Sequence, residues 1–544
     1  MRRFGTPAIS TVILALILLL AAALRLAGVH WGLPDAAHPD YSWHPDEPLP
    51  ILWAHWMAQG HFIAKQFIYG GTLHYSILNA YYHYGTLLAP ILGGISPLAN
   101  TILVGRYVVV AASLLTIFLV YLTGRQLFGV AAGLLAAAFL ALSPVHIFLA
   151  QNVRPDEIGT LFVVALLYLS ALILRGDAAR DRRHFIAAGL VLGGAMALRL
   201  PLAVFGIGPM LACLLRERCA GPAAWPWALL CRRLLLLGLA AIAAYAVCSP
   251  YSLLHPDWLI QGLQVQKQYQ TSVFADAIGR GPGIYQYGWL TLRQALGLSL
   301  YALALAGVLL ACCRPQPGRL LILVPALCYF ILLAFINWIV VRYTMPLAPL
   351  LALLAASLVV AAVQGRPGWC YPLYAAVIAA LAWTLAADLA FLRVQAGRNV
   401  RDLASDWIVA HTPAGAAIVD VQQYQGDVYL NPVIPAGYVH NVYLLSGGMD
   451  PQILTQGDGH DYLILNQGLY DNMERLRPGE LSPAIDALRQ VVHGGAYRLE
   501  AQIARPVEFF GIDFSDEFTS QDYQIINPGQ RIYRFVAAPA PAPE

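Results

Sequence analysis

Charged side chains are scarce in this 544-residue chain, and that scarcity excludes most classes of soluble protein. Asp, Glu, Lys and Arg together make up 12% of the residues, about half of the roughly 25% that is usual for soluble domains. Lysine occurs only twice, at Lys65 and Lys267, and the net charge of +3 is too small and too dispersed to indicate a nucleic-acid partner. Hydrophobic residues reach 59% and the mean hydropathy is +0.61. This composition predicts a multi-span membrane protein.

Motifs for metal and nucleotide binding are missing as well. The sequence has no CxxC or HExxH spacing, which would indicate a zinc site, and no GxxxxGK[ST] loop, which argues against direct use of ATP. None of the eight cysteines lies in residues 30–97 or after residue 393, which excludes a disulfide framework in those regions. Six histidines crowd residues 31–97, so a divalent metal is an open alternative, although histidines bonded to lipid headgroups explain them better. The six are His38, His44, His55, His61, His74 and His83.

About eleven stretches are apolar enough to cross a bilayer as α-helices, since a span takes about 20 mostly apolar residues and lipid offers no other backbone partners. The stretches are 9–27, 98–122, 131–149, 158–174, 185–198, 202–215, 234–248, 296–312, 320–338, 346–363 and 371–392. The segment Thr72–Gly94 carries histidines and tyrosines, which suits a helix in the membrane interface better than a span. The predicted fold class is therefore mainly α, a polytopic membrane helical bundle.

The placement of arginine predicts the orientation of this bundle. With the N-terminus in the cytoplasm, most arginines of the membrane region fall in inner loops, as the positive-inside rule requires. The loops 30–97 and 249–294 and the whole chain after residue 392 are then extracytoplasmic. We therefore expect a multi-pass protein of the plasma (inner) membrane, with the first span as an uncleaved anchor.

The composition returns to that of a soluble domain after Arg393. Residues 402–411 have helical spacing, and four later stretches, including 416–421 and 531–535, are typical of strands. These features predict a membrane domain over residues 1–392, a small α/β or α+β extracytoplasmic domain over 393–536, and a disordered tail over 537–544. This domain either covers and stabilises the membrane domain or takes part in binding a ligand.

Ionisable residues gather near the predicted outer face, where they are functional candidates because placing charge near a bilayer is costly. The candidates are His44, Asp46, Glu47, Arg154, Asp156, Glu157, Arg199, Arg342 and Tyr343. Each set has a structural explanation, since acids favour the first turn of a helix and arginines snorkel to the interface. Together, carboxylates that orient a hydroxyl and arginines that hold a phosphate suit transfer of a group from a lipid phosphate.

Three short motifs carry a resemblance to a known superfamily. Asp46-Glu47 stands in a long first outer loop, Arg125-Gln-Leu-Phe-Gly129 lies between the second and third spans, and Ser143-Pro144 precedes Arg154-Pro-Asp156. In this order, and with Arg342-Tyr-Thr-Met-Pro346, the chain resembles the GT-C membrane glycosyltransferases over roughly residues 1–420. The resemblance is to protein O-mannosyltransferases and aminoarabinose transferases in particular.

The resemblance implies an enzyme that takes a sugar from a polyprenyl-phosphate monosaccharide on the outer face of the membrane. The acceptor would be a hydroxyl of a glycan, lipid or protein, and the transfer a single inverting displacement. Asp46 would be the general base, with Glu47 as the neighbouring acid. The cations expected to stabilise the leaving phosphate are Arg342 first, then Arg154, Lys65, Arg199 and Lys267.

Two readings from other classes stay open at this point. A transporter or flippase would explain many spans without chemistry, but such proteins tend to have paired halves and polar groups near the midplane. A non-catalytic protein that binds lipid-linked sugars would keep the arginines and have no use for Asp46.

Overall fold

The computed structural model describes residues 7–36, 38–176, 181–219, 227–268, 283–336, 338–365, 368, 370–422, 429–445, 451–455, 460–475 and 483–536. The predicted tail 537–544 and the middle of the predicted loop 249–294 lie outside the described residues. The chain divides into two compact units. The first contains the residues up to His30 and those from Asp46 to Asp388, and the second contains Trp31–Pro45 and the chain from Leu389 onward.

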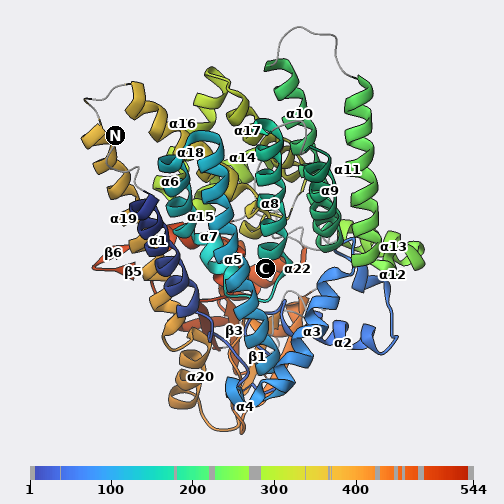
Figure 1. The fold of residues 1–544 in the computed structure, drawn as a ribbon. Coiled ribbons are helices and arrows are strands. Elements are labelled where there is room, and N and C mark those ends of the chain that lie inside the picture. Colours follow the sequence, from blue (N-terminus) through green and yellow to red (C-terminus); the bar gives the residue numbers. More distant parts are fainter. Residues whose placement is uncertain are drawn as a thin grey trace. The chain divides into compact units, whose positions relative to one another are not determined.

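The first unit is a bundle of helices, which confirms the predicted fold class (Figure 1). Its long helices are α1 (Pro7–Ala27), α5 (Pro97–Phe128), α8 (Pro155–Arg175), α9 (Asp181–Leu198), α10 (Ile207–Cys219), α11 (Trp227–Cys248), α16 (Leu298–Cys313), α17 (Pro317–Ala334), α18 (Leu347–Gly365) and α19 (Cys370–Ala396). Two further helices, α6 (Val130–Ala141) and α7 (Pro144–Ala150), are bent by 61° at their junction. Proline opens several of these helices because its missing N–H needs no partner in the first turn.

All eleven apolar stretches are helical, but they are not equally suited to span a membrane. Among the described residues, eight helices are long and apolar enough, and the bent pair α6–α7 makes a ninth. The two remaining stretches lie in α9, which begins with the charged Asp181-Arg-Arg, and in α16, which has only 16 residues. The segment Thr72–Gly94 forms the separate helices α3 (Leu73–Leu87) and α4 (Ala89–Leu92), and neither is among the candidate spans.

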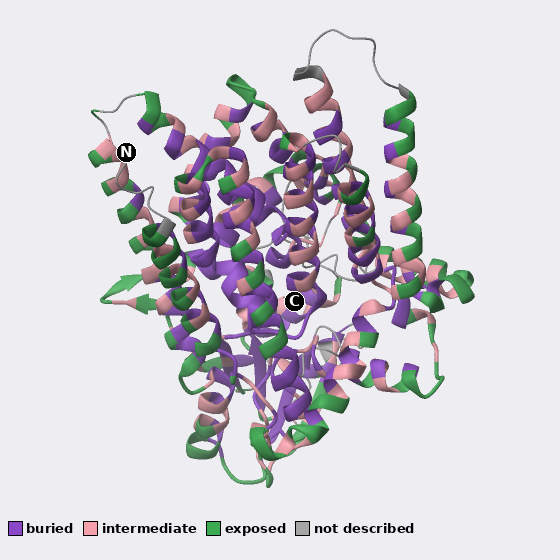
Figure 2. Cartoon of the chain, viewed as in Figure 1, coloured by how far each residue is buried: buried purple, intermediate pink, exposed green. Residues whose placement is uncertain are grey.

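Helix α18 is the most buried of the candidate spans, with 72% of its apolar window inside the protein, and Figure 2 shows mainly buried residues in this part of the bundle. It packs against α5, α6, α16 and α17. Small residues allow the close approach that lipid-embedded helices use. A Cβ atom on Gly307 of α16 would lie 2.6 Å from the backbone of Leu354 on α18, and one on Gly133 of α6 would lie 2.5 Å from the Tyr121 carbonyl of α5.

Short elements between the long helices carry many of the polar residues. They are α2 (Pro48–Ala58), η2 (Ala64–Phe67), η4 (Leu200–Gly206), α12 (Pro250–Leu254), α13 (Pro256–Gln268) and η8 (Val341–Thr344). The turn before α3 reaches the end of α9, because a Cβ on Gly71 would lie 2.2 Å from the Ala197 carbonyl oxygen. This contact brings the segment after α2 beside the turn that contains Arg199.

The second unit contains the mixed α/β domain that the sequence predicts after the last span. Its five-stranded sheet has the order β2-β1-β3-β7-β4, in which β1, β2 and β3 are parallel and β7 is antiparallel to β3 and β4. The strands are β1 (Ala417–Gln422), β2 (Val439–Leu444), β3 (Tyr462–Asn466), β4 (Tyr497–Ile503) and β7 (Gln530–Phe535). Alternate side chains point to opposite faces. Ile408 of α20 (Val400–His411) packs on one face, and α21 (Gln467–Arg475) and α22 (Pro483–His493) contribute to the other.

Candidate active site

Five charged side chains of the first unit form one connected series that alternates in sign. The series runs Arg342, Asp46, Arg154, Asp156, Arg199. Arg342 Nη1 lies 3.7 Å from Asp46 Oδ2, and Arg154 Nη1 donates to the same carboxylate oxygen. Arg154 Nε donates to Asp156 Oδ2 at 3.1 Å, and Arg199 Nη1 lies 2.8 Å from Asp156 Oδ1. We call this set the arginine–aspartate series, and it unites candidates that are up to 296 positions apart, from Asp46 to Arg342.

Local sequence explains how the turns present these side chains. Arg154 is the N-cap of α8 in extended conformation, because a residue before a proline is driven out of the helical region and Pro155 follows it. Asp156 and Glu157 then fall in the first turn of α8, where the helix dipole favours acids. Arg199 has a similar extended N-cap position before η4, which contains Pro201. The preferences of helix ends therefore explain the position of each residue in its own turn. The ion pairs between these residues are a separate feature that those preferences do not require.

The series contains three guanidinium groups and two carboxylates, so it carries one excess positive charge. Its two carboxylates differ in access, since the side chain of Asp46 is 37% exposed and that of Asp156 only 2%. Asp156 is thus a buried bridge between two arginines, whereas Asp46 keeps part of its surface open. A cationic site with one accessible carboxylate suits an anionic ligand next to a group that accepts a proton.

Aromatic rings surround the outer two arginines of the series. The guanidinium of Arg342 lies 4.6 Å from the centre of the Trp338 ring and 5.6 Å from that of Tyr343. Arg199 lies 5.5 Å from the ring of Tyr69 and 5.4 Å from that of Tyr343. Tyr343, a predicted site residue, therefore stands between the two cations. Such rings stabilise a partly desolvated guanidinium and hold its plane.

Burial raises the pKa of the Tyr69 phenol, and Arg199 lowers it in part. Burial also lowers the pKa of His74 on α3 to about 3, with Asp156 opposing and Arg199 reinforcing this effect. His74 is therefore neutral at ordinary pH and adds no charge to the site.

The second acid of the first pair, Glu47, has a different environment from Asp46. Its two carboxylate oxygens accept hydrogen bonds from Arg106 of α5, at 3.0 Å from Nε and 2.8 Å from Nη2. The Val153 N–H donates to Glu47 at 2.9 Å, and Arg106 also donates to the Val29 carbonyl at 2.8 Å. Both side chains are fully buried. Glu47, the residue that follows Asp46 in the sequence, is thus held in a bidentate ion pair with Arg106.

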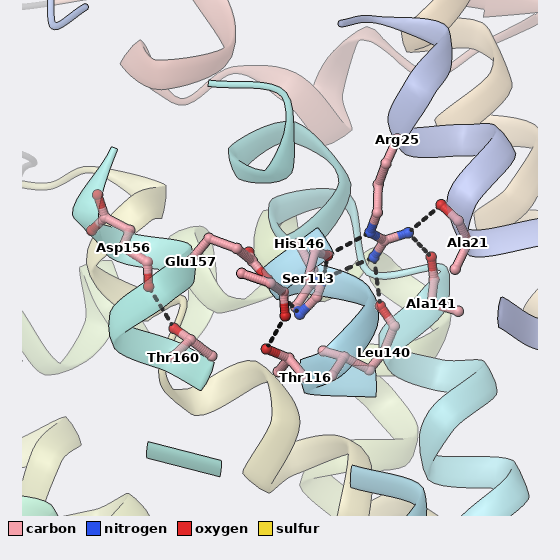
Figure 3. Close-up of polar contacts among 11 residues, drawn as sticks. Ala21, Arg25, Ser113, Thr116, Leu140, Ala141, His146, Asp156, Glu157 and Thr160 are labelled. Atoms are coloured by element: carbon pink, nitrogen blue, oxygen red, sulfur yellow. Dashed lines mark hydrogen bonds and ion pairs between the residues drawn. The ribbon is translucent and has the colours of Figure 1, made fainter. Parts of the chain in front are cut away.

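The second acid of the other pair, Glu157, is also fully buried. Its Oε1 lies 3.3 Å from Nε2 of His146 on α7. Figure 3 shows that Glu157 points toward His146, Ser113 and Arg25, whereas Asp156 points away from them. Consecutive residues of a helix differ by about 100° in direction, so one turn can serve two surroundings.

Three predicted candidates lie apart from the contacts just described. Lys65 on η2 and Lys267 on α13 are both exposed. His44 is buried in the segment Trp31–Pro45 of the second unit, where its carbonyl accepts a hydrogen bond from Ser42 at 3.1 Å. Within the described part of the chain, no group of three or more His, Cys, Asp or Glu side chains could hold a metal ion.

Sequence reasoning missed Arg106, which pairs with Glu47, and Arg25, whose Nη2 lies 2.8 Å from His146 Nδ1. Both lie inside apolar stretches that were predicted to span the membrane, where a charge is itself a signal of function. That signal was available in the sequence, but their partners on other helices were not.

Comparison with known proteins shows which families and folds this chain is similar to. Residues 91–247 match the family model described as dolichyl-phosphate-mannose-protein mannosyltransferase. The matched region extends from α4 into α11 and includes Arg154, Asp156 and Arg199, but not Asp46. No curated protein matches the chain in sequence.

Two solved structures are similar to this chain. The oligosaccharyltransferase of Archaeoglobus fulgidus, tethered to an acceptor peptide, is similar with a TM-score of 0.50 and 15% identity, over 96% of this chain and 78% of that one. ArnT from Cupriavidus metallidurans, bound to undecaprenyl phosphate, has a TM-score of 0.48 and 14% identity, over 98% and 99% of the two chains. The likeness to the oligosaccharyltransferase supports the predicted fold, and residues 91–247 match a glycosyltransferase family of the kind that the sequence motifs resemble.

Proposed function

We propose that this protein transfers a sugar from a polyprenyl-phosphate monosaccharide to an acceptor hydroxyl with inversion, and that Asp46 is the general base. The observation that carries the proposal is the arginine–aspartate series, with its single excess positive charge beside one accessible carboxylate. A phosphodiester carries one negative charge, so the donor would neutralise that excess. The description of the matching family names dolichyl-phosphate-mannose, which supports a lipid-phosphate donor.

The reaction is a single displacement at the anomeric carbon. Asp46 takes the proton of the acceptor hydroxyl while that oxygen forms its bond to the anomeric carbon. The bond between the anomeric carbon and the phosphate oxygen breaks on the opposite side of the sugar, and the electron pair leaves with the lipid phosphate. Negative charge therefore increases on the phosphate, and preorganised guanidinium groups stabilise that increase.

The contacts divide the remaining roles. Arg154 orients Asp46 through its Nη1, and Arg342 lies on the other side of the same carboxylate oxygen. Arg199 and Arg154 share the buried Asp156, which fixes the distance between the two guanidinium groups and places both at the proposed phosphate site. Glu47 differs from its predicted role as a second acid, because its bidentate contact with a buried arginine suits a positioning residue.

The orientation follows from the arginine distribution and completes the proposal. With the N-terminus in the cytoplasm, the arginine–aspartate series and the C-terminal domain lie on the extracytoplasmic side of the plasma membrane. Lipid-linked sugars are the donors available on that side, where soluble nucleotide sugars are scarce. Accessibility of a single engineered cysteine near Asp46 to an impermeant thiol reagent in whole cells tests this orientation. Protection in intact cells, with labelling only after lysis, would contradict it.

The proposal is tested with purified protein in lipid nanodiscs and a panel of polyprenyl-phosphate monosaccharides. Release of free polyprenyl phosphate is followed with and without cell-envelope extract as the source of acceptor. We expect release from one class of donor, dependent on acceptor, and a product of inverted anomeric configuration. A retained configuration would refute the single displacement, and binding of donor without release would favour a carrier or flippase.

A further inference from the structure

A second polar network lies beside the first turn of α8 and has no role in the proposed reaction. It consists of Arg25 on α1, Ser113 on α5, His146 on α7 and Glu157 on α8 (Figure 3). All four side chains are fully buried. Four charged or polar side chains from four helices, inside a membrane bundle, are costly to bury unless their contacts are specific.

Arg25 satisfies the backbone at the bend between α6 and α7. In a continuous helix the Leu140 carbonyl would accept from residue 144, but Pro144 has no N–H to donate, and the Ser143 N–H donates to it at 3.2 Å instead. Arg25 Nη2 lies 3.5 Å from the Leu140 carbonyl oxygen, and Nη1 donates to the carbonyls of Ala141 and of Ala21, each at 3.0 Å. The guanidinium thus joins α1 to the open end of α6 and stabilises the 61° bend.

The same guanidinium fixes the ring of His146. Arg25 Nη2 lies 2.8 Å from His146 Nδ1, and Arg25 Nε donates to Ser113 Oγ at 2.6 Å. An arginine only donates, so Nδ1 accepts and the ring proton is on Nε2. Nε2 faces Glu157 Oε1 at 3.3 Å. Hydrogen bonds therefore run from the bend to His146, and the close approach of His146 to Glu157 continues this series of contacts to the first turn of α8.

The first turn of α8 is consequently held from two sides. Glu157 faces the buried network, and the preceding residue, Asp156, bridges Arg154 and Arg199. Any rotation of this turn that breaks the contact with His146 also moves the carboxylate between the two arginines. Interiors are close-packed, so such a turn moves as a unit and not atom by atom.

We propose that Arg25, Ser113, His146 and Glu157 are positioning residues for phosphate recognition. They hold the first turn of α8 in the orientation in which Asp156 sets the geometry of both neighbouring guanidinium groups. The inference rests on the proposed function, because it requires a phosphate ligand at the arginine–aspartate series.

The test measures the dissociation constants of undecaprenyl phosphate and of undecaprenol, the same lipid without phosphate, for purified protein in nanodiscs. The variants are Glu157→Gln and Ser113→Ala. Glu217→Gln is the control, because it makes the same Glu-to-Gln change away from this network: the Glu217 carboxylate lies 3.1 Å from Arg233 Nη1, in the last turn of α10. We expect the preference for phosphate over alcohol to fall about tenfold in Glu157→Gln. A smaller fall is expected in Ser113→Ala and none in Glu217→Gln.

The ratio of the two lipids separates positioning from general damage, since a loosened fold weakens both lipids equally. An unchanged ratio in Glu157→Gln and Ser113→Ala would overturn the inference. Absence of any preference for phosphate in the unmodified protein would instead refute the proposed function.

If Glu157→Gln fails to fold, the double variant Arg25→Met/Glu157→Gln removes both charges and leaves neither buried alone. We expect this double variant to fold and still to lose the phosphate preference, and a normal preference would overturn the inference. If neither Glu157→Gln nor the double variant folds, the phosphate preference of Ser113→Ala is the test, because this variant removes one hydroxyl and no charge.

Discussion

Replacing Arg106 by methionine is expected to destabilise the membrane domain severely, although Arg106 touches no predicted substrate. Methionine has a similar length and a high helix propensity, so α5 itself should persist. The change removes the bidentate contact with Glu47 and the hydrogen bond to the Val29 carbonyl. Glu47 is then a fully buried acid whose described hydrogen bond is the one from the Val153 N–H.

The expected magnitude follows from the burial of both partners. Breaking a buried ion pair by removing one member costs about 3–5 kcal/mol, because an uncompensated charge stays inside. Removing both charges avoids most of that cost, so Arg106→Met/Glu47→Gln should regain the greater part of the loss. Exposed pairs are the contrast: Arg398–Asp406 at 2.6 Å has both side chains about 60% exposed, and such pairs contribute little to stability because water screens them.

The assay is unfolding by titration with SDS in mixed micelles, followed by tryptophan fluorescence, for the unmodified protein, Arg106→Met, the double variant and Arg398→Met. We expect a large loss for Arg106→Met, partial recovery in the double variant and little change in Arg398→Met. The reasoning is refuted if Arg106→Met unfolds within about 0.5 kcal/mol of the unmodified protein, or if the double variant is the less stable of the two.

Three further results are expected. Because burial lowers the pKa of His74 to about 3 from 6.5, the unfolded chain binds a proton that the folded chain excludes between these values. Stability should therefore fall by about 2 kcal/mol from pH 7.5 to pH 5, and His74→Gln should remove most of this slope, whereas an unaltered slope would contradict the burial argument. Arg199→Lys loses planar, two-pronged contact with phosphate and with Asp156, so kcat/KM for the donor should drop about tenfold or more; unchanged kinetics would exclude Arg199 from phosphate binding. Lys65→Gln and Lys267→Gln should each alter kcat/KM less than about twofold, because both side chains are exposed, and a large loss in either would restore its predicted role.

Composition and hydropathy predict most of the fold, because a bilayer leaves helices as the only solution for long apolar stretches in this chain. They do not predict the break between α6 and α7, which lies within one apolar stretch, although Pro144 follows the bend. Nor do they distinguish full spans from shorter helices such as α16.

The candidate site could be predicted in part, since Arg154, Asp156, Arg199 and Arg342 are polar residues near the ends of apolar stretches and Asp46 stands in the long first outer loop. Adjacent acids cannot be separated in this way. In Asp46-Glu47 and in Asp156-Glu157, the first acid belongs to the arginine–aspartate series, and the second is buried with partners from other helices. Which partner each acid contacts depends on packing between helices. The two lysines show that the rarity of a residue type in the sequence does not indicate that it belongs to the site.

The central claim is that Asp46 takes the acceptor proton beside a phosphate held by arginines. The most direct measurement compares the unmodified protein with Asp46→Asn in a single turnover with polyprenyl-phosphate sugar and acceptor, together with the affinity of each for undecaprenyl phosphate. The amide keeps the shape of the side chain and cannot act as a base. We predict that Asp46→Asn binds the lipid phosphate at least as tightly and transfers sugar at least about a hundredfold more slowly. Transfer at an unchanged rate would contradict the account.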